Sequence, residues 1–102
     1  MVVTDRLLHS RRARAVAREF VNKFLSGKCC RDCKTTNRHV LEFDHVKWGK
    51  RYAIATMVSK GYSIKAIEEE IKKCHIRCAN CHRLVTRRRR LRAMRLERAL
   101  TP

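Results

Sequence analysis

Three features of the sequence predict a small α+β domain. The chain has 102 residues, which fits one small domain. The core of such a domain buries a modest share of the surface, so a cross-link such as a structural metal adds useful stability. Two C-x2-C pairs, Cys30 with Cys33 and Cys78 with Cys81, have the spacing with which four thiolates close on one structural zinc. Short strand-like runs lie close to both pairs, and helical periodicity fills most of the remaining chain.

Residues 4–26 are predicted to form a basic helix, with Thr4 as its N-cap and Gly27 as its stop. Because the charge balance of residues 1–27 is strongly basic, we expect this helix to lie along phosphates as well as to pack on the core. A solvated helix that only packs on the core is the alternative. The apolar face is predicted to contain Ala13, Val16, Ala17, Phe20, Val21 and Phe24.

The zinc-stapled core is expected in residues 28–86. Cys29, Cys30 and Cys33 allow two pairings, and the two-residue spacing favours Cys30 with Cys33, which leaves Cys29 as a spare thiol packed near the site. The segment that follows is predicted to contain a strand (39–45), a basic loop with Trp48 and Gly49 (46–52) and a short helix (54–60). A further helix is expected to be capped by Ser63 and to end near Lys73, and the residues on its core face are Ile64, Ile67, Ile71 and Cys74. A second strand (75–77) completes the segment.

The last predicted element is a helix that begins at Asn80 or Cys81 and ends near Leu100. Its packing positions are expected to be Leu84, Leu91 and Met94, and its arginine-rich part forms an extension over residues 87–102. The chain contains no sign of a linker or a second domain, so residues 1–102 are predicted to form a single domain.

The formal net charge is +17, from 26 Lys and Arg against 9 Asp and Glu. A folded domain with this charge is expected to bind a polyanion, with duplex DNA as the first candidate. A membrane partner is not expected, because no basic amphipathic stretch has the aromatic or leucine face that insertion needs. The sequence has neither a long apolar run nor an apolar signal-peptide centre, so a cytoplasmic protein is predicted, in which cysteines favour metal over disulfides.

Three further polar residues lie next to the predicted zinc site but are not needed as ligands of the zinc: Asp44, His45 and His82. Asp44 and His82 offer a carboxylate and an imidazole that can share one divalent ion with water and phosphate. A histidine such as His45 can take a proton from water near neutral pH. The alternative is that all three are surface residues or outer partners of the zinc. Together they predict hydrolysis of a phosphodiester bond assisted by a divalent ion.

The segments Cys30-x2-Cys33, Leu41-Glu42-Phe43-Asp44-His45 and Cys78-Ala79-Asn80-Cys81-His82-Arg83 resemble the HNH endonucleases, in particular the small cysteine-stapled kind common in phages. The resemblance covers residues 28–86 and implies the ββα-metal fold of the HNH, or His-Me finger, nucleases: two short strands and a helix around one catalytic ion. It implies His45 as the general base, Asp44 and His82 as ligands of that ion, and the four cysteines as ligands of a structural zinc.

One position departs from the family pattern. Many members have an asparagine about five residues before the first cysteine of the second pair, where this chain has Lys73. Asn80 is the only asparagine nearby, so either Asn80 takes the orienting role of that residue, or the role is absent or filled by backbone.

The sequence therefore predicts a metal-dependent DNA endonuclease with one structural Zn²⁺ and one catalytic divalent ion such as Mg²⁺ or Mn²⁺. The alternative from another class is a zinc-stapled module that binds nucleic acid without cutting it. A third interpretation is a redox-sensing zinc protein with Cys29 and Cys74 as reactive thiols. The residues expected to contact nucleic acid are Arg11, Arg12, Arg18, Lys47, Lys50, Arg51, Arg83, Arg87, Arg88, Arg89 and Arg90.

Overall fold

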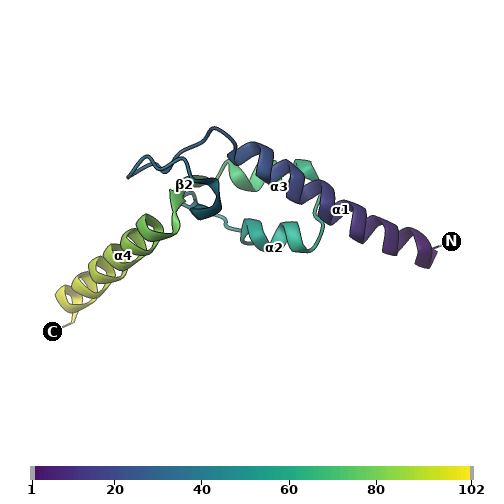
Figure 1. Cartoon of the computed structure of the whole chain (residues 1–102). Helices are drawn as coiled ribbons and strands as arrows, with labels where there is room; N and C mark the ends of the chain where they lie inside the picture. The colour runs from purple at the N-terminus through teal and green to yellow at the C-terminus, as the bar shows by residue number, and fades with distance from the viewer. Residues whose placement is uncertain (1, 102) are drawn as a thin grey trace.

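The computed structural model describes the backbone of residues 2–101 and the side chains of residues 10–101. The elements in chain order are α1 (Val2–Leu25), a 3-10 turn η1 (Arg38–Val40), β1 (Leu41–His45), α2 (Ile54–Ser59), α3 (Ile64–Ile71), β2 (Cys74–Cys78) and α4 (Ala79–Leu100). The sheet, α2 and α3 form a centre from which α1 and α4 extend in opposite directions (Figure 1), which gives the chain principal extents of 63 × 34 × 17 Å. The prediction of a small α+β fold is confirmed.

The two strands pair antiparallel, with Leu41 opposite Cys78 and Asp44 opposite His75. Because successive side chains of a strand point to opposite faces, the sheet has one largely apolar face and one polar face. The apolar face has Leu41, Phe43 and Ile76 among its members, and these contact the core. Polar side chains make up the other face: Glu42, Asp44, His75 and Arg77.

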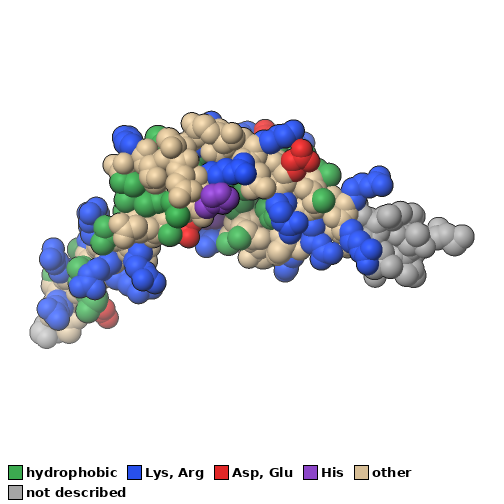
Figure 2. Space-filling model, viewed as in Figure 1, with side chains coloured by type: hydrophobic (Ala, Val, Ile, Leu, Met, Phe, Trp, Pro, Cys, Tyr) green, Lys and Arg blue, Asp and Glu red, His purple; other side chains and the backbone are tan. Residues whose placement is uncertain are grey.

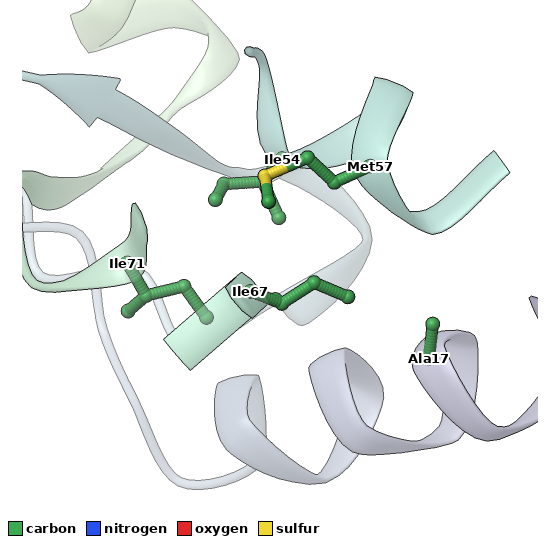
Figure 3. Close-up of a cluster of buried hydrophobic side chains, with 5 residues drawn as sticks. All are labelled: Ala17, Ile54, Met57, Ile67 and Ile71. Atoms are coloured by element: carbon green, nitrogen blue, oxygen red, sulfur yellow. The ribbon is translucent and has the colours of Figure 1, made fainter. Parts of the chain in front are cut away.

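Two hydrophobic clusters hold the centre together. The larger one joins α1, α2 and α3 through Ala17, Ile54, Met57, Ile67 and Ile71 (Figure 3). Ile67 and Ile71 are four residues apart, so they lie on one side of α3 and face the other two helices. The smaller cluster joins the end of α1 to the sheet and the cysteine region through Leu25, Cys30, Leu41 and Cys78.

Most element positions agree with the prediction, and Gly27 does follow α1 with a φ of +78°, in the left-handed region that glycine adopts without strain. Ser63 does cap α3, since its side chain accepts a hydrogen bond from the Ala66 N–H. The prediction that Thr4 is the N-cap of the first helix was wrong, because α1 begins at Val2. Val16, predicted to face the core, is 44% exposed.

The expected packing positions of the last helix were also wrong. Leu84, Leu91 and Met94 are 45%, 40% and 50% exposed, because most of α4 extends beyond the sheet and has no neighbouring element to cover it (Figure 1). Among the helices that the structure describes, none has an apolar stretch of the length needed to cross a membrane.

Candidate metal centre and neighbouring acid–histidine pairs

Four cysteine side chains converge where the loop after α1 meets the start of α4. Cys30 and Cys33 come from that loop, Cys78 ends β2, and Cys81 lies in the first turn of α4. Their sulfur atoms all lie within 4.8 Å of one another. Among residues 10–101 they form the one group of three or more histidine, cysteine or acidic side chains that could hold a metal ion.

The geometry of the four sulfurs fits a tetrahedral ion. Sulfurs about 2.3 Å from a tetrahedral zinc lie about 3.8 Å apart, and the Sγ atoms of Cys33 and Cys78 are 3.7 Å apart. Backbone N–H groups point at the sulfurs: those of Asp32 and Cys33 donate to Cys30 at 3.4 and 3.5 Å, and that of Cys81 donates to Cys78 at 3.4 Å. The four cysteines could therefore hold a metal such as zinc.

The same contacts alter the acidity of the thiols. Burial alone would raise the pKa of Cys30, but backbone hydrogen bonds, with that of Cys33 the strongest, outweigh it and lower the pKa to about 6. The neighbouring Cys78 sulfur and burial raise the pKa of Cys81 to about 12. Without a metal, four sulfurs this close cannot all carry a negative charge, and a divalent cation would remove that conflict.

Asp44 lies on the polar face of the sheet and is 2% exposed. Its carboxylate accepts hydrogen bonds from Arg77 of β2 and from both terminal nitrogens of Arg89 of α4, the latter at 2.9 Å each. Burial opposes ionisation of Asp44, but the hydrogen bonds from Arg89 and Arg77 outweigh it and lower the pKa of the carboxyl group below its usual value. Asp44 is therefore a buried anion held by two guanidinium groups.

His82 of α4 lies between two carboxylates of β1. Its Nδ1 is 2.9 Å from an oxygen of Glu42, and its Nε2 is 3.4 Å from Oδ1 of Asp44. A carboxylate at Nδ1 fixes the orientation of the ring and, in the neutral histidine, leaves Nε2 as the acceptor. The arrangement directs the lone pair of Nε2 at the position beside Asp44.

His45 is directed away from these two residues, because it follows Asp44 on the strand and faces the other side of the sheet. Its Nε2 is 2.9 Å from Glu70 of α3, and the two side chains are 10% and 2% exposed. Glu70 also accepts hydrogen bonds from the Arg51 backbone N–H and from Lys73, both at 2.9 Å. The structure thus brings Asp44 and His82 together and pairs His45 with Glu70.

Other predicted site residues lie on the surface. Asn80 is exposed in the first turn of α4 and lines, with Glu42, His82 and several arginines, a groove of about 1040 Å³ along that helix. Cys29 is exposed and lies outside the four-sulfur cluster. Of the arginines expected to contact nucleic acid, Arg89 is engaged with Asp44. The remaining predicted contacts are exposed: Arg11, Arg12, Arg18, Lys47, Lys50, Arg51, Arg83, Arg87, Arg88 and Arg90.

The sequence interpretation overlooked three residues that organise the site. Glu42 orients His82, Arg77 links Asp44 to Asp32 between the first two cysteines, and Glu70 holds His45. The burial of Glu70 could have been predicted from the sequence, since Glu70 shares a helical face with Ile67 and Ile71. A buried carboxylate needs hydrogen-bond or charged partners. The partners of Glu42 and Arg77 follow from the strand register, which the sequence alone does not fix.

Comparisons with known proteins identify no relative. No family model, curated protein or solved structure matches this chain.

Replacing Cys78 or Cys81 with serine should abolish zinc binding and unfold the domain, because a structural zinc contributes on the order of 10–16 kcal/mol, as much as the whole stability of a small domain. Metal analysis and thermal melting of the purified variants measure this. Cys29→Ser is the matched control, since its exposed thiol lies outside the cluster and its melting curve should not change. Equal melting curves for the Cys29 and Cys78 variants would contradict a structural role for the metal.

Replacing Glu70 with glutamine should lower the free energy of unfolding by about 2–3 kcal/mol at neutral pH. Burial alone would raise the pKa of Glu70, but hydrogen bonds from the Arg51 N–H, Lys73 and His45 lower it to about 2, below the ordinary value of 4.5. The folded carboxylate therefore stabilises the protein above pH 4.5, and this contribution is lost as the pH falls toward 2.

Urea unfolding of the wild type and the Glu70→Gln variant at several pH values measures this difference, which should be constant above pH 5 and shrink below 4.5. Glu69→Gln is the control, because Glu69 makes only an exposed ion pair with Lys72 and should change stability by less than about 0.5 kcal/mol. A Glu70 variant as stable as the Glu69 variant would show that the buried hydrogen bonds contribute nothing.

Proposed function

We propose that this protein is a metal-dependent endonuclease of the HNH type that hydrolyses phosphodiester bonds of DNA, with a zinc ion on the four cysteines. The observation that carries the proposal is the pairing of His82 with Asp44, in which Nε2 lies 3.4 Å from Oδ1 while Glu42 holds the other ring nitrogen. The antiparallel strand pair followed by a helix that contacts both strands supports a ββα-metal core.

The spacing of the Asp44 and His82 side chains supports a shared divalent ion. Two ligand atoms about 2.1 Å from an ion and at right angles to each other are about 3 Å apart, close to the 3.4 Å between Oδ1 and Nε2. When bound, the ion would polarise the phosphate and stabilise the leaving oxygen. Arg89, whose side chain is 47% exposed, would exchange its contact with Asp44 for a phosphate oxygen as DNA binds.

The proposed base is His45, at the end of β1 directly after Asp44. Glu70 is ionised at neutral pH and accepts a hydrogen bond from the Nε2–H of His45, so Nδ1 is the nitrogen left to take a proton from water. Glu70 then has the orienting role for which Asn80 was considered, since Asn80 is exposed on α4.

The charge distribution supports a phosphate-rich partner. Arginine and lysine side chains cover α4 and much of the described part of α1 (Figure 2). On α4, arginines line the groove that also contains His82, so basic groups surround the proposed position of the scissile phosphate. Neutralised phosphates release counterions and provide most of the affinity in such an interface.

The second candidate is a zinc-stapled nucleic-acid-binding module that does not cut. Two contacts favour it: Arg77 and Arg89 already neutralise Asp44, and His45 faces Glu70 on the other side of the sheet. A binding module would need neither histidine, whereas a nuclease needs both, so substitution of the histidines separates the two functions.

In a plasmid-nicking assay with added Mg²⁺ or Mn²⁺, His45→Ala should lower the single-turnover rate by about 10²–10⁴-fold, because the proton acceptor is lost. Asp44→Asn and His82→Ala should lower it as well, with partial recovery at high metal concentration, because they weaken the divalent ion. His39→Ala, an exposed histidine of η1, is the control and should cleave normally. Cleavage at the wild-type rate by the His45 variant would leave the binding module as the function.

DNA affinity should fall steeply with salt. Replacing Arg87, Arg88 and Arg90 together with alanine should reduce the slope of log affinity against log salt by about 3, since each lost phosphate contact removes about 0.9. The triple variant keeps Arg89 and so leaves Asp44 paired. Filter binding or fluorescence anisotropy measures the slope, with Lys23→Ala as a control because Lys23 already pairs with Glu19. An unchanged slope would exclude α4 from the DNA interface.

A further inference from the structure

Trp48 is the only tryptophan of the chain, and it is 99% exposed. A large aromatic ring left entirely in water is unusual, because burying it contributes more free energy than burying most other side chains. Neither the four-cysteine cluster nor the Asp44, His45 and His82 groups involves this residue. Its exposure leaves the whole ring free to contact a partner outside the domain.

The backbone of the loop that carries Trp48 is hydrogen-bonded both before and after this residue. The N–H groups of Val46 and Lys47 donate to the carbonyl of Lys73 at 2.9 and 3.1 Å. The ammonium of Lys73 in turn donates to the carbonyl of Gly49 at 2.8 Å. Both neighbours of Trp48 are thus bonded to one residue that precedes β2, so the backbone that presents the ring is fixed.

The far end of the loop is fixed as well. The Arg51 N–H donates to the buried carboxylate of Glu70, and the Arg51 guanidinium lies 5.7 Å from the centre of the Tyr62 ring. Tyr52 packs edge-on against Tyr62 with ring centres 5.6 Å apart. A preorganised loop loses little conformational entropy on binding, which suits it to hold a ligand on an exposed ring.

The surroundings of Trp48 select the class of ligand. Lys47 and Lys50, both exposed, flank it in the sequence, and the chain has a net charge of +17. An exposed aromatic side chain with basic neighbours in the sequence suits a nucleobase attached to phosphates, where the ring stacks on the base and the ammonium groups contact the backbone. A lipid surface fits less well, because the other large hydrophobic side chains of the loop, Val46 and Tyr52, are only 38% and 39% exposed, and Tyr52 packs against Tyr62.

We infer that Trp48 is a base-stacking residue that binds an unpaired or unstacked nucleobase, so that the protein prefers single-stranded DNA or duplexes with unpaired bases over perfect duplexes. The inference deepens the proposed function because it rests on DNA as the partner, but it does not require cleavage. Since Trp48 follows His45 by three residues and Glu70 bonds both His45 and the Arg51 N–H, the stacked base would lie on the His45 side of the sheet.

Fluorescence of the 102-residue His45→Ala chain, purified with zinc, tests this, because Trp48 is the only tryptophan of the chain. Without added divalent ion, the protein is titrated with a single-stranded oligonucleotide, a perfect duplex and a duplex containing an unpaired loop. Stacking should quench the emission strongly with the first and third ligands and weakly with the perfect duplex. Quenching that is equal for all three, or absent, would overturn the inference.

Substitutions in the same background provide the matched comparison. Trp48→Ala should weaken binding of the single strand by about 5- to 150-fold, the typical effect of losing one stacked base, and change binding of the perfect duplex little. Trp48→Phe should recover most of the affinity and Trp48→Leu little of it. Lys47→Ala should weaken all three ligands alike, since it removes a phosphate contact.

Two further outcomes separate this inference from its competitors. Preferential binding to vesicles containing phosphatidylserine, with a blue shift of Trp48 emission, would overturn it and assign the ring to a lipid surface. Quenching by single-stranded DNA together with wild-type protein that never cleaves would uphold the stacking role and contradict only the endonuclease.

Discussion

The convergence of four thiols determines how the rest of the molecule is assembled. Cys30 and Cys33 come from the loop that ends α1, and Cys78 and Cys81 come from the junction of β2 with α4, so a metal on these sulfurs joins segments 45 residues or more apart. The hydrophobic clusters are small for a chain of 102 residues, and most of α4 has no packing partner. A metal bound at this junction would therefore fix the direction in which α4 leaves the sheet.

The direction of α4 brings side chains of this helix to the polar face of the sheet. Once α4 begins at Ala79, His82 lies one turn along it, opposite Glu42 and Asp44, and Arg89 reaches the same carboxylate two turns later. Asp32, between the first two cysteines, holds Arg77 in the same network. The four-cysteine cluster and the Asp44 site are thus connected by charged hydrogen bonds, so a change in one is expected to alter the other.

On the opposite side, a single buried acid organises a second group. Glu70 is 2% exposed, and its two oxygens contact His45, Lys73 and the backbone of the loop that follows β1. Burying a carboxylate costs free energy unless charged partners and hydrogen bonds compensate, and here they keep it ionised. The loop that presents Trp48 and the ring of His45 depend on the same side chain, which couples the proposed base to the proposed stacking surface.

Most of the secondary structure, the grouping of the four cysteines and the basic character of the chain could be predicted from local sequence patterns. Ser63 and Gly27 act through local backbone geometry, and the C-x2-C spacing restricts two sulfurs to one ion, so neither needs knowledge of distant contacts. The partners of the titratable groups, in contrast, depend on how distant segments of the chain pack together. The strand register directs Asp44 and His45 to opposite faces, and the exit of α4 brings Arg89 to Asp44 and leaves Leu91 in solvent. These pairings depend on residues far apart in the chain, and local patterns contain no information about which distant side chain arrives.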